Sequence, residues 1–299
     1  MLSEAHTETI HEAGAQAGAA AAHAEHAADP GSQILHHILD APYLEVPFTE
    51  LKIPLPQIHL PEALGGYDIS ITKHVVMMWI SCGILLLLFG LAARRVKEPV
   101  PRGLRNLLEV LVVFIRDEVA RKSIAHNADK FTGYLLTTFF FILTCNLLGL
   151  VPSMATATGN ISVTAGLALV AFVMIQMGGI REFGVIQHFK NLVPPGLPIW
   201  LVPIMFALEV LSMFIKPFAL CIRLFANMMA GHVVILAFIS LIFILGSMFS
   251  PAVGWAASPL AVFFALFVNV LEILVALLQA YIFTMLTAQF IGMSVHPAH

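Results

Sequence analysis

Residues 212–232 read SMFIKPFALCIRLFANMMAGH, and they place Arg223 inside an almost wholly apolar run that continues to Phe249. A charge at bilayer depth costs ~2.5 to 3.5 kcal/mol even on the most lenient insertion scale. An arginine cannot lose its proton to avoid that cost, so a permanent cation here points to a function. Two structural explanations stay open: the side chain extends to the lipid headgroups, or it pairs with a buried carboxylate and holds helices together.

The composition of the whole chain is that of an integral membrane protein. Of the 299 residues, 59% are hydrophobic and 11% are charged, and the mean hydropathy is +0.89. Soluble domains are usually about 45 to 50% apolar. No glycine-rich phosphate loop with its lysine is present, so no nucleotide is expected to bind. The sequence predicts an all-α membrane protein without cofactor, metal or nucleic acid.

Residues 74–93 predict the first transmembrane helix, because about 20 apolar residues span a hydrocarbon core of ~30 Å. Basic residues follow it directly: Arg94, Arg95, Lys97, Arg102 and Arg105. The positive-inside rule places this end in the cytoplasm and the N-terminus outside. Residues 104–125 repeat apolar residues with a helical period, which predicts an amphipathic helix on the cytoplasmic surface. Glu109 and Arg116 disfavour the alternative, a full span.

Two further spans, residues 131–151 and 161–177, form a predicted transmembrane hairpin whose turn lies outside. Asn146 and Gln176 inside these spans are expected to make hydrogen bonds between helices rather than to carry ions. Residues 1–34 are rich in Ala, His and Glu and predict a disordered tail before a single membrane domain at 35–293, and residues 294–299 form a second tail.

The longest apolar tract covers residues 197–248. As one helix it would measure ~78 Å, more than twice the thickness of the hydrocarbon core. It either breaks into two upright helices, with Pro217 as a candidate break, or lies steeply tilted, roughly 20 to 25° from the membrane plane. A turn is expected between Gly246 and Pro259, followed by an antiparallel helix over residues 260–292.

Four polar residues of this tract fall on one side of the expected helix. At 100° per residue, one stripe carries Glu209, Ser212, Lys216 and Arg223, while His232 lies on the opposite side. On the last helix Asn269, Glu272 and Gln279 share a face. Glu272 is the only acidic residue after Glu209, and His232 is its most plausible partner, since a histidine beside a carboxylate can exchange protons near physiological pH. A static pair that holds two helices together is the alternative.

Several short motifs of these two helices resemble the a subunit of rotary F-type ATP synthases. They are Lys216-Pro217, Arg223-Leu224-Phe225, Asn227-Met228 and Ala230-Gly231, with Gln279 downstream. The resemblance covers roughly residues 35–293 and implies that the two long helices are tilted. It also implies a proton-conducting, non-catalytic stator subunit that couples proton flow to ATP synthesis. Its implied partners are a c-subunit ring, a b-subunit peripheral stalk, the rest of the synthase and lipid, in the bacterial plasma (inner) membrane.

The resemblance implies a role for each polar residue. Arg223 would meet the carboxylate of each passing c subunit. An outer half-channel would contain His232, Glu272, Asn269 and Asn227, and a cytoplasmic one Glu209 and Ser212. Lys216 either joins the cytoplasmic half-channel or extends to the lipid headgroups. Gln279 either packs near Arg223 or makes an ordinary hydrogen bond between helices.

At two positions the sequence departs from the commonest bacterial pattern, because His232 stands where many relatives have an acid and Glu272 where they have a histidine. This exchange, which resembles the mitochondrial relatives, suggests that the two residues meet. A secondary ion-coupled transporter is the alternative function, but its signature of an internal repeat with broken helices is not found.

Overall fold

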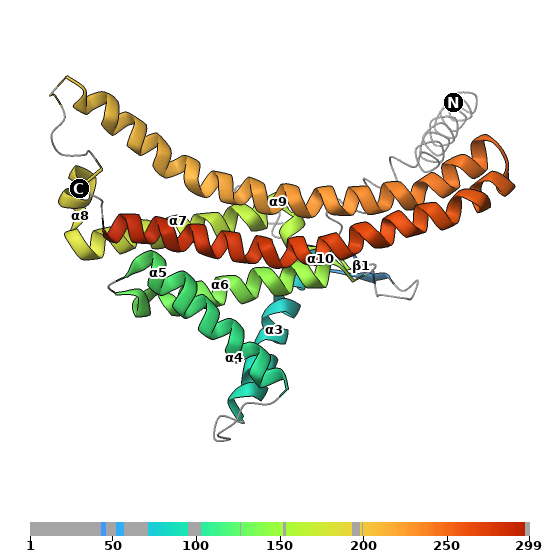
Figure 1. The fold of residues 1–299 in the computed structure, drawn as a ribbon, viewed down its shortest axis with the longest axis horizontal. Coiled ribbons are helices and arrows are strands. Elements are labelled where there is room, and N and C mark those ends of the chain that lie inside the picture. The colour runs from blue at the N-terminus through green and yellow to red at the C-terminus, as the bar shows by residue number, and fades with distance from the viewer. Residues whose placement is uncertain are drawn as a thin grey trace, which may run out of the picture. The chain divides into compact units, whose positions relative to one another are not determined.

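The fold is described by a computed structural model that covers residues 43–45, 52–56, 71–94, 103–125, 127–151, 154–192, 198 and 200–296 (Figure 1). The chain divides into two compact units. The larger unit comprises Asp40–Ala230 and Val270–His299, and the smaller comprises Met1–Leu39 and Gly231–Asn269. The predicted N-terminal tail, residues 1–34, lies outside the described residues.

Helices form almost all of the described structure, and five of them are long and apolar enough to cross a membrane. These five are α3 (Lys73–Arg94), α6 (Ala128–Gly149), α7 (Ile161–Phe183), α9 (Val202–Met248) and α10 (Pro251–Val295). The shorter elements are β1 (Tyr43–Glu45), β2 (Lys52–Pro54), α4 (Leu104–Phe114), a π-helix (Ile115–Ala120), α5 (Arg121–Ile124), a 3₁₀-helix (Ala157–Gly159) and α8 (Val185–Lys190). The strands β1 and β2 pair antiparallel. The predicted fold class, an all-α membrane protein, is confirmed.

The last turn of the fold is shorter than the sequence predicted. α9 continues to Met248 and α10 already begins at Pro251, nine residues before the expected start at 260. A proline at the first helical position loses no hydrogen bond, because that amide would have no partner within the helix. The carbonyl of Ser250 accepts from the amides of Val253 and Gly254, at 3.0 and 3.3 Å. The prediction of a turn from Gly246 to Pro259 is therefore wrong, and Pro259 lies inside α10.

The end of α7 was also placed too early by the sequence. The helix runs past residue 177 to Phe183, and Gly184 follows it with a positive φ of 78°. Glycine adopts this backbone conformation without steric cost, so the chain can turn there directly into α8, which the sequence did not predict. At the other end of α7, the side chain of Asn160 accepts from the amide of Ser162 at 2.9 Å and caps the helix.

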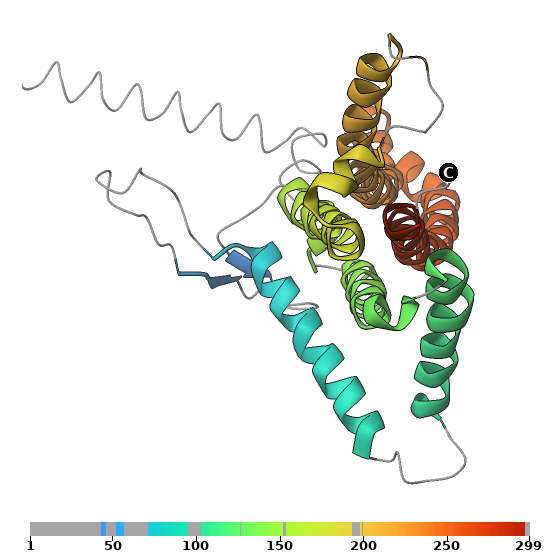
Figure 2. The ribbon, with the colours of Figure 1, turned by 90° about the vertical axis from the view of Figure 1, so that its left-hand side faces the viewer.

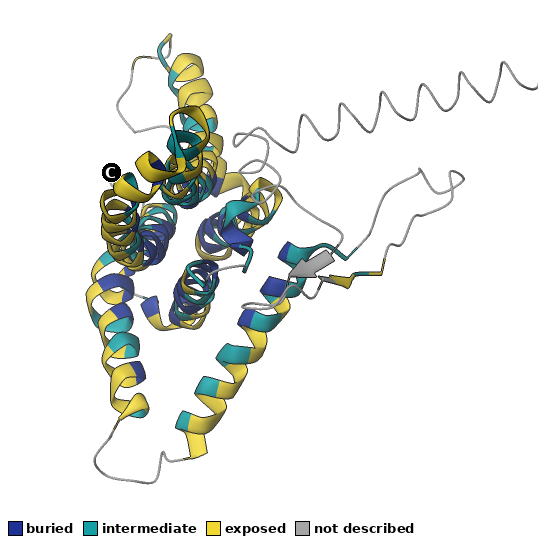
Figure 3. Ribbon diagram, turned by 90° about the vertical axis from the view of Figure 1, so that its right-hand side faces the viewer, coloured by how far each residue is buried: buried dark blue, intermediate teal, exposed yellow. Residues whose placement is uncertain are grey.

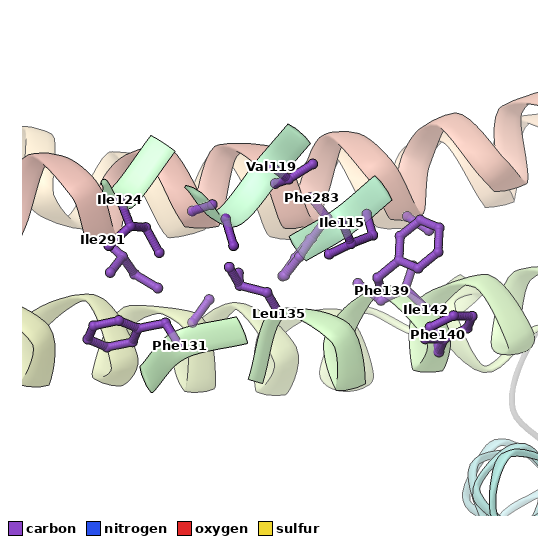
Figure 4. Close-up of a cluster of buried hydrophobic side chains, with 14 of the residues drawn as sticks. Ile115, Val119, Ile124, Phe131, Leu135, Phe139, Phe140, Ile142, Phe283 and Ile291 are labelled. Atoms are coloured by element: carbon purple, nitrogen blue, oxygen red, sulfur yellow. The ribbon is translucent and has the colours of Figure 1, made fainter. Parts of the chain in front are cut away.

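The core of the larger unit lies where the segment from α4 to α5 packs against α6 and α10 (Figure 4). Its fully buried side chains include Ile115, Val119, Ile124, Leu135, Ile142, Phe283 and Ile291. α10 approaches α5 closely, because a Cβ added at Gly292 would lie 2.0 Å from the carbonyl oxygen of Ser123. The apolar face of the amphipathic segment is thus covered by helices, while an ion pair such as that between Arg121 and Asp117, at 2.8 Å, lies on its outer face.

α6 and α7 lie beside the C-terminal part of α10, as Figure 2 shows from one end. Figure 3 shows that buried residues of α6 lie toward its neighbours, whereas the C-terminal half of α3 is largely exposed. Leu86 and Leu87 of α3 are 77% and 62% exposed. Broad apolar exposure of this kind suits a helix that faces lipid.

The smaller unit contains the far ends of α9 and α10, which form a helical hairpin. The rings of Phe238 and Phe264 stack with centroids 5.5 Å apart. Nearer the turn, a Cβ added at Gly254 would lie 2.8 Å from the carbonyl oxygen of Ile242 and 2.9 Å from the Cα of Gly246. The absence of a side chain at Gly254 therefore lets the two helices approach closely, as small residues do in membrane helix pairs.

Candidate functional site

Arg223 lies on the exposed side of α9. The buried residues of the helix lie on another face, centred roughly 120° around the axis from Arg223; they are Pro217, Leu220, Cys221, Leu224 and Met228. Their spacing of three to four residues is that of a helix packed along one face. Within the described parts of the chain, Arg223 makes neither a hydrogen bond nor an ion pair. Its cation is therefore not neutralised by a carboxylate of those residues.

A hydrogen bond joins α9 to α10 one turn beyond Arg223. The amide nitrogen Nδ2 of Asn227 donates to Oε1 of Gln279 over 3.1 Å. Gln279 is buried, with 3% of its surface exposed, while Asn227 is exposed. The structure thus brings together two of the residues predicted for the site. Gln279 makes a hydrogen bond between helices, next to the turn that carries Arg223.

A second contact between the same two helices lies at Lys216. Its Nζ lies 5.3 Å from the centroid of the Phe290 ring, within the range of a cation–π interaction. The two contacts are eleven residues apart on each helix and run in opposite directions along the chain. Within the larger unit α9 and α10 are therefore antiparallel, as the sequence predicted. Lys216 itself is half-buried, and its partner Phe290 was not predicted from the sequence.

α7 packs along another side of α9. Thr164 Oγ1 and Cys221 Sγ are 3.5 Å apart, and the rings of Phe172 and Phe214 stack with centroids 5.4 Å apart. These contacts also run antiparallel. Beyond Phe214, toward the start of α9, lie Glu209 and Ser212. Both belong to the polar stripe predicted from the sequence, and both are half-buried.

The remaining predicted site residues lie further along the two long helices. Glu272 is buried on α10, with 4% of its surface exposed, and belongs to the larger unit. His232 and Asn269 belong to the smaller unit, and both are half-buried. A shared site of His232 and Glu272 therefore stays a prediction from the sequence.

Asn146 of α6 contacts α10 between Glu272 and Gln279. It is fully buried, and its Nδ2 donates to the carbonyl of Ala276 at 3.3 Å. Its Oδ1 accepts from the hydroxyl of Thr158 at 2.6 Å. The prediction that Asn146 forms a bond between helices is confirmed. Thr158 was missed, because a threonine in a turn carries no sequence signal of a distant partner.

Comparisons with known proteins identify the family. A family model described as "ATP synthase A chain" matches residues 75–292. A protein of Chloroherpeton thalassium named "ATP synthase subunit a" is 48% identical over 274 residues, which cover 89% of this chain and 77% of that protein. A protein of the same name from Myxococcus xanthus is 46% identical over 288 residues, 87% of this chain and 92% of that protein.

A third relative, "ATP synthase subunit a 2" of Prosthecochloris aestuarii, is 45% identical over 301 residues, which cover 96% of this chain and 89% of that protein. Similarity of this level over most of both sequences agrees with the five long apolar helices described above. The chain therefore belongs to the ATP synthase A chain family, as a subunit a of the membrane sector in an energy-transducing membrane.

Proposed function

We propose that this chain is the proton-conducting stator subunit of an ATP synthase, and that Arg223 faces the membrane-buried carboxylates of a rotating c ring. One observation carries the proposal: Arg223 is exposed on an apolar helix and has no carboxylate partner among the described residues of its own chain. A cation at bilayer depth is costly without a counter-charge. A rotor carboxylate that passes Arg223 supplies that counter-charge from outside the chain.

The charge of Arg223 promotes proton release from the carboxylates of the rotor. A fixed cation nearby lowers the pKa of a carboxylate, so the rotor group releases its proton as it approaches Arg223. Once past the arginine, the carboxylate faces lipid and must be reprotonated. Two half-channels that are offset along α9 and α10 serve these two events. Arg223 also prevents a direct leak between them, because its guanidinium does not give up a proton.

The polar residues along the two long helices divide between the half-channels. We assign His232, Glu272, Asn269 and Asn227 to the outer one. Glu209 and Ser212 belong to the cytoplasmic one, with Lys216 beside it. The 3.1 Å bond from Asn227 to Gln279 supports a positioning role for Gln279, because it fixes α10 against α9 one turn from Arg223.

The length of α9 supports a tilted arrangement in the membrane. Its 47 residues form one helix through Pro217, with a length of ~70 Å against a hydrocarbon core of ~30 Å. Such a helix lies steeply inclined and presents many turns to a curved rotor. We place the protein in the bacterial plasma (inner) membrane with its N-terminus outside, and a b-subunit stalk holds it against the rotor. Because the chain belongs to the ATP synthase A chain family, we set aside the alternative function, a secondary ion-coupled transporter.

Replacing Arg223 tests the proposal. We expect Arg223→Ala in the assembled complex to abolish ATP-driven proton uptake by inverted membrane vesicles, because the rotor carboxylate then lacks its counter-charge. Arg223→Lys should restore little, since a buried ammonium can lose its proton and lacks the planar fork of a guanidinium.

Arg181→Ala provides the matched control, because Arg181 is an exposed arginine in the last turn of α7, and we expect uptake close to that of the unmodified complex. The amount of complex in the membranes is measured in parallel. Proton uptake by the Arg223→Ala vesicles would show that the central assignment is wrong.

A further inference from the structure

A second polar cluster lies where α8 and the C-terminal end of α10 meet the end of α7 (Figures 1 and 2). His188 of α8 is buried, with 6% of its surface exposed, and its Nε2 lies 2.9 Å from Oε1 of Gln176 in α7. The hydroxyl of Ser294 in α10 donates to the carbonyl of Ile175 at 2.9 Å. Three elements thus contribute polar side chains to one place.

Gly179 of α7 has no side chain, and this leaves the space that the cluster occupies. A Cβ added at Gly179 would lie 2.3 Å from Nδ1 of His188 and 2.4 Å from Oγ of Ser294. The imidazole nitrogen and the hydroxyl therefore approach the same point and are at most 4.7 Å apart, the total of these two distances. Any larger residue at position 179 would displace the ring or the hydroxyl.

The contact with Gln176 sets the tautomer of His188. An amide oxygen only accepts, so Nε2 carries the proton and donates it, and Nδ1 is left with a lone pair on the side of Gly179 and Ser294. Burial lowers the pKa of His188 and favours the neutral ring. A neutral imidazole with one fixed N–H and one free lone pair can take up a proton at Nδ1 and release it again.

The cluster lies at the same end of the helices as the proposed cytoplasmic half-channel. Gln176 is four residues beyond the Phe172–Phe214 stack along α7, and Ser212 lies beyond it in the corresponding direction along α9. Ser294 follows Phe290, the partner of Lys216, by four residues. The other five residues of α8 are all exposed, so His188 is the one buried side chain of this short helix.

We propose that His188 is a proton-transfer residue at the cytoplasmic mouth of the pathway, an inference that rests on the function proposed above. During ATP hydrolysis Nδ1 takes a proton from hydronium on the cytoplasmic side, which leaves water, and releases this proton toward Glu209; during synthesis the transfer is reversed. The proton on Nε2 stays with Gln176, and the ring returns to the neutral form after each transfer. The charged and titratable groups near this end of the same elements are Arg181 and Glu182 of α7, Lys190 of α8, Glu209 of α9 and His296 after α10.

The variant His188→Gln tests this role, because glutamine can keep an amide contact with Gln176 but cannot carry a proton. The readout is ATP hydrolysis by the whole complex in inverted vesicles with an uncoupler present, so that no gradient forms. We expect a loss of roughly tenfold, below the ~10² that general acid–base groups often contribute, because water can replace the imidazole in part. Imidazole added to the medium should restore at least half of the lost rate, relative to the unmodified complex with imidazole.

A pair of glycine variants in α7 tests the geometry. Gly179→Ala should show a similar loss, since the new methyl group would lie 2.3 Å from Nδ1 and displace the ring. Gly166→Ala is the matched control, because a Cβ there meets nothing within 4 Å, and its hydrolysis rate should be unchanged.

An unchanged rate in His188→Gln, or a loss that imidazole does not restore, would overturn the inference, the latter because it indicates a structural role. The failure of the proposed function is distinguishable. If Arg223→Ala abolishes proton uptake while His188→Gln hydrolyses normally, only the role of His188 is refuted; if Arg223→Ala still takes up protons, the proposed function itself fails.

Discussion

At the scale of single residues, buried amide side chains in the described part of the chain have hydrogen-bond partners, whereas Arg223 does not. Asn146 is fully buried, and both ends of its amide have partners, the carbonyl of Ala276 and the hydroxyl of Thr158. Gln279 likewise accepts from Asn227. Polar groups that hold helices together are expected to be paired, because an unpaired buried group is costly. The exposed guanidinium of Arg223 instead suits a residue whose partner belongs to another subunit.

A residue-scale prediction concerns His232 and Glu272, which the exchange of acid and imidazole in the sequence assigns to one proton-relay unit. If both residues serve one proton path, the loss of either interrupts the same path, and a second loss has little left to remove. We expect His232→Ala and Glu272→Ala each to reduce ATP-driven proton uptake strongly, and the double variant to add little. The measurement is a double-mutant cycle of uptake rates in inverted vesicles.

The exchanged variant, which combines His232→Glu with Glu272→His, serves as the internal control for this prediction. It should take up protons faster than His232→Glu alone, because it again contains one acid and one imidazole. Strictly additive losses together with no recovery in the exchanged variant would show that the two residues act separately. The outer half-channel would then have to be assigned around Asn227 and Asn269.

At the scale of elements, glycines decide how closely the helices approach. Gly292 lets α10 lie against the backbone of α5, and Gly254 lets α10 lie against α9 near their turn. In membranes, where lipid is as apolar as the side chains, close van der Waals contact drives helices together. Because these glycines have no side chain, they permit the close contacts that stabilise the arrangement, although glycine costs about 1 kcal/mol of helix propensity relative to alanine.

The hairpin of the smaller unit permits a matched test of that statement. Gly254→Ala should destabilise the protein by about 1 to 3 kcal/mol, because the new methyl group would meet the backbone of Ile242 at 2.8 Å. Gly246→Ala should be neutral or slightly stabilising, since its methyl group meets the Cα of Gly254 at an ordinary 3.8 Å. The midpoint of thermal unfolding of the purified complex in mild detergent compares the two, and equal midpoints would contradict the close contact.

At the scale of the whole molecule, the positions of the basic residues predict how the protein is oriented in the membrane. The cluster after α3 and the residues near the ends of α7 and α8, Arg181 and Lys190, are expected on the cytoplasmic side. The turn between α6 and α7 is then outside. Both proposals above depend on this orientation, because they place the start of α9 and His188 at the cytoplasmic face.

Labelling of single cysteines tests the orientation. In a background in which the exposed Cys82 is replaced by serine, Gln187→Cys in α8 should react with a membrane-impermeant maleimide in inverted vesicles and be protected in intact spheroplasts. Ser162→Cys at the start of α7 should show the opposite pattern. Both positions are exposed, so a lack of reaction on one side reports the membrane rather than burial. The reverse pattern at both positions would invert the proposed topology.

The sequence by itself determined the fold class, the number of long apolar helices and the position of Arg223. These follow from local quantities, because a run of about 20 apolar residues must be helical in lipid and a single cation within it is visible in the sequence. The position of Gln279 near Arg223 was implied by the family resemblance and not by the helical period. The bounds of α7 and α10 were less well predicted, since proline and glycine act differently at a helix end and inside a helix.

Only the tertiary structure decided which residues touch across helices. Three contacts illustrate this, and each joins residues of two different helices. They are the contact of Lys216 with Phe290, the hydrogen bond from Asn146 to the Ala276 carbonyl and the close approach of His188 to Gly179. Such contacts depend on the register and spacing of packed helices, which are set by many small steric terms along the whole interface. No local pattern in the sequence records them, and for this reason the cluster around His188 appears only when α7, α8 and α10 are assembled.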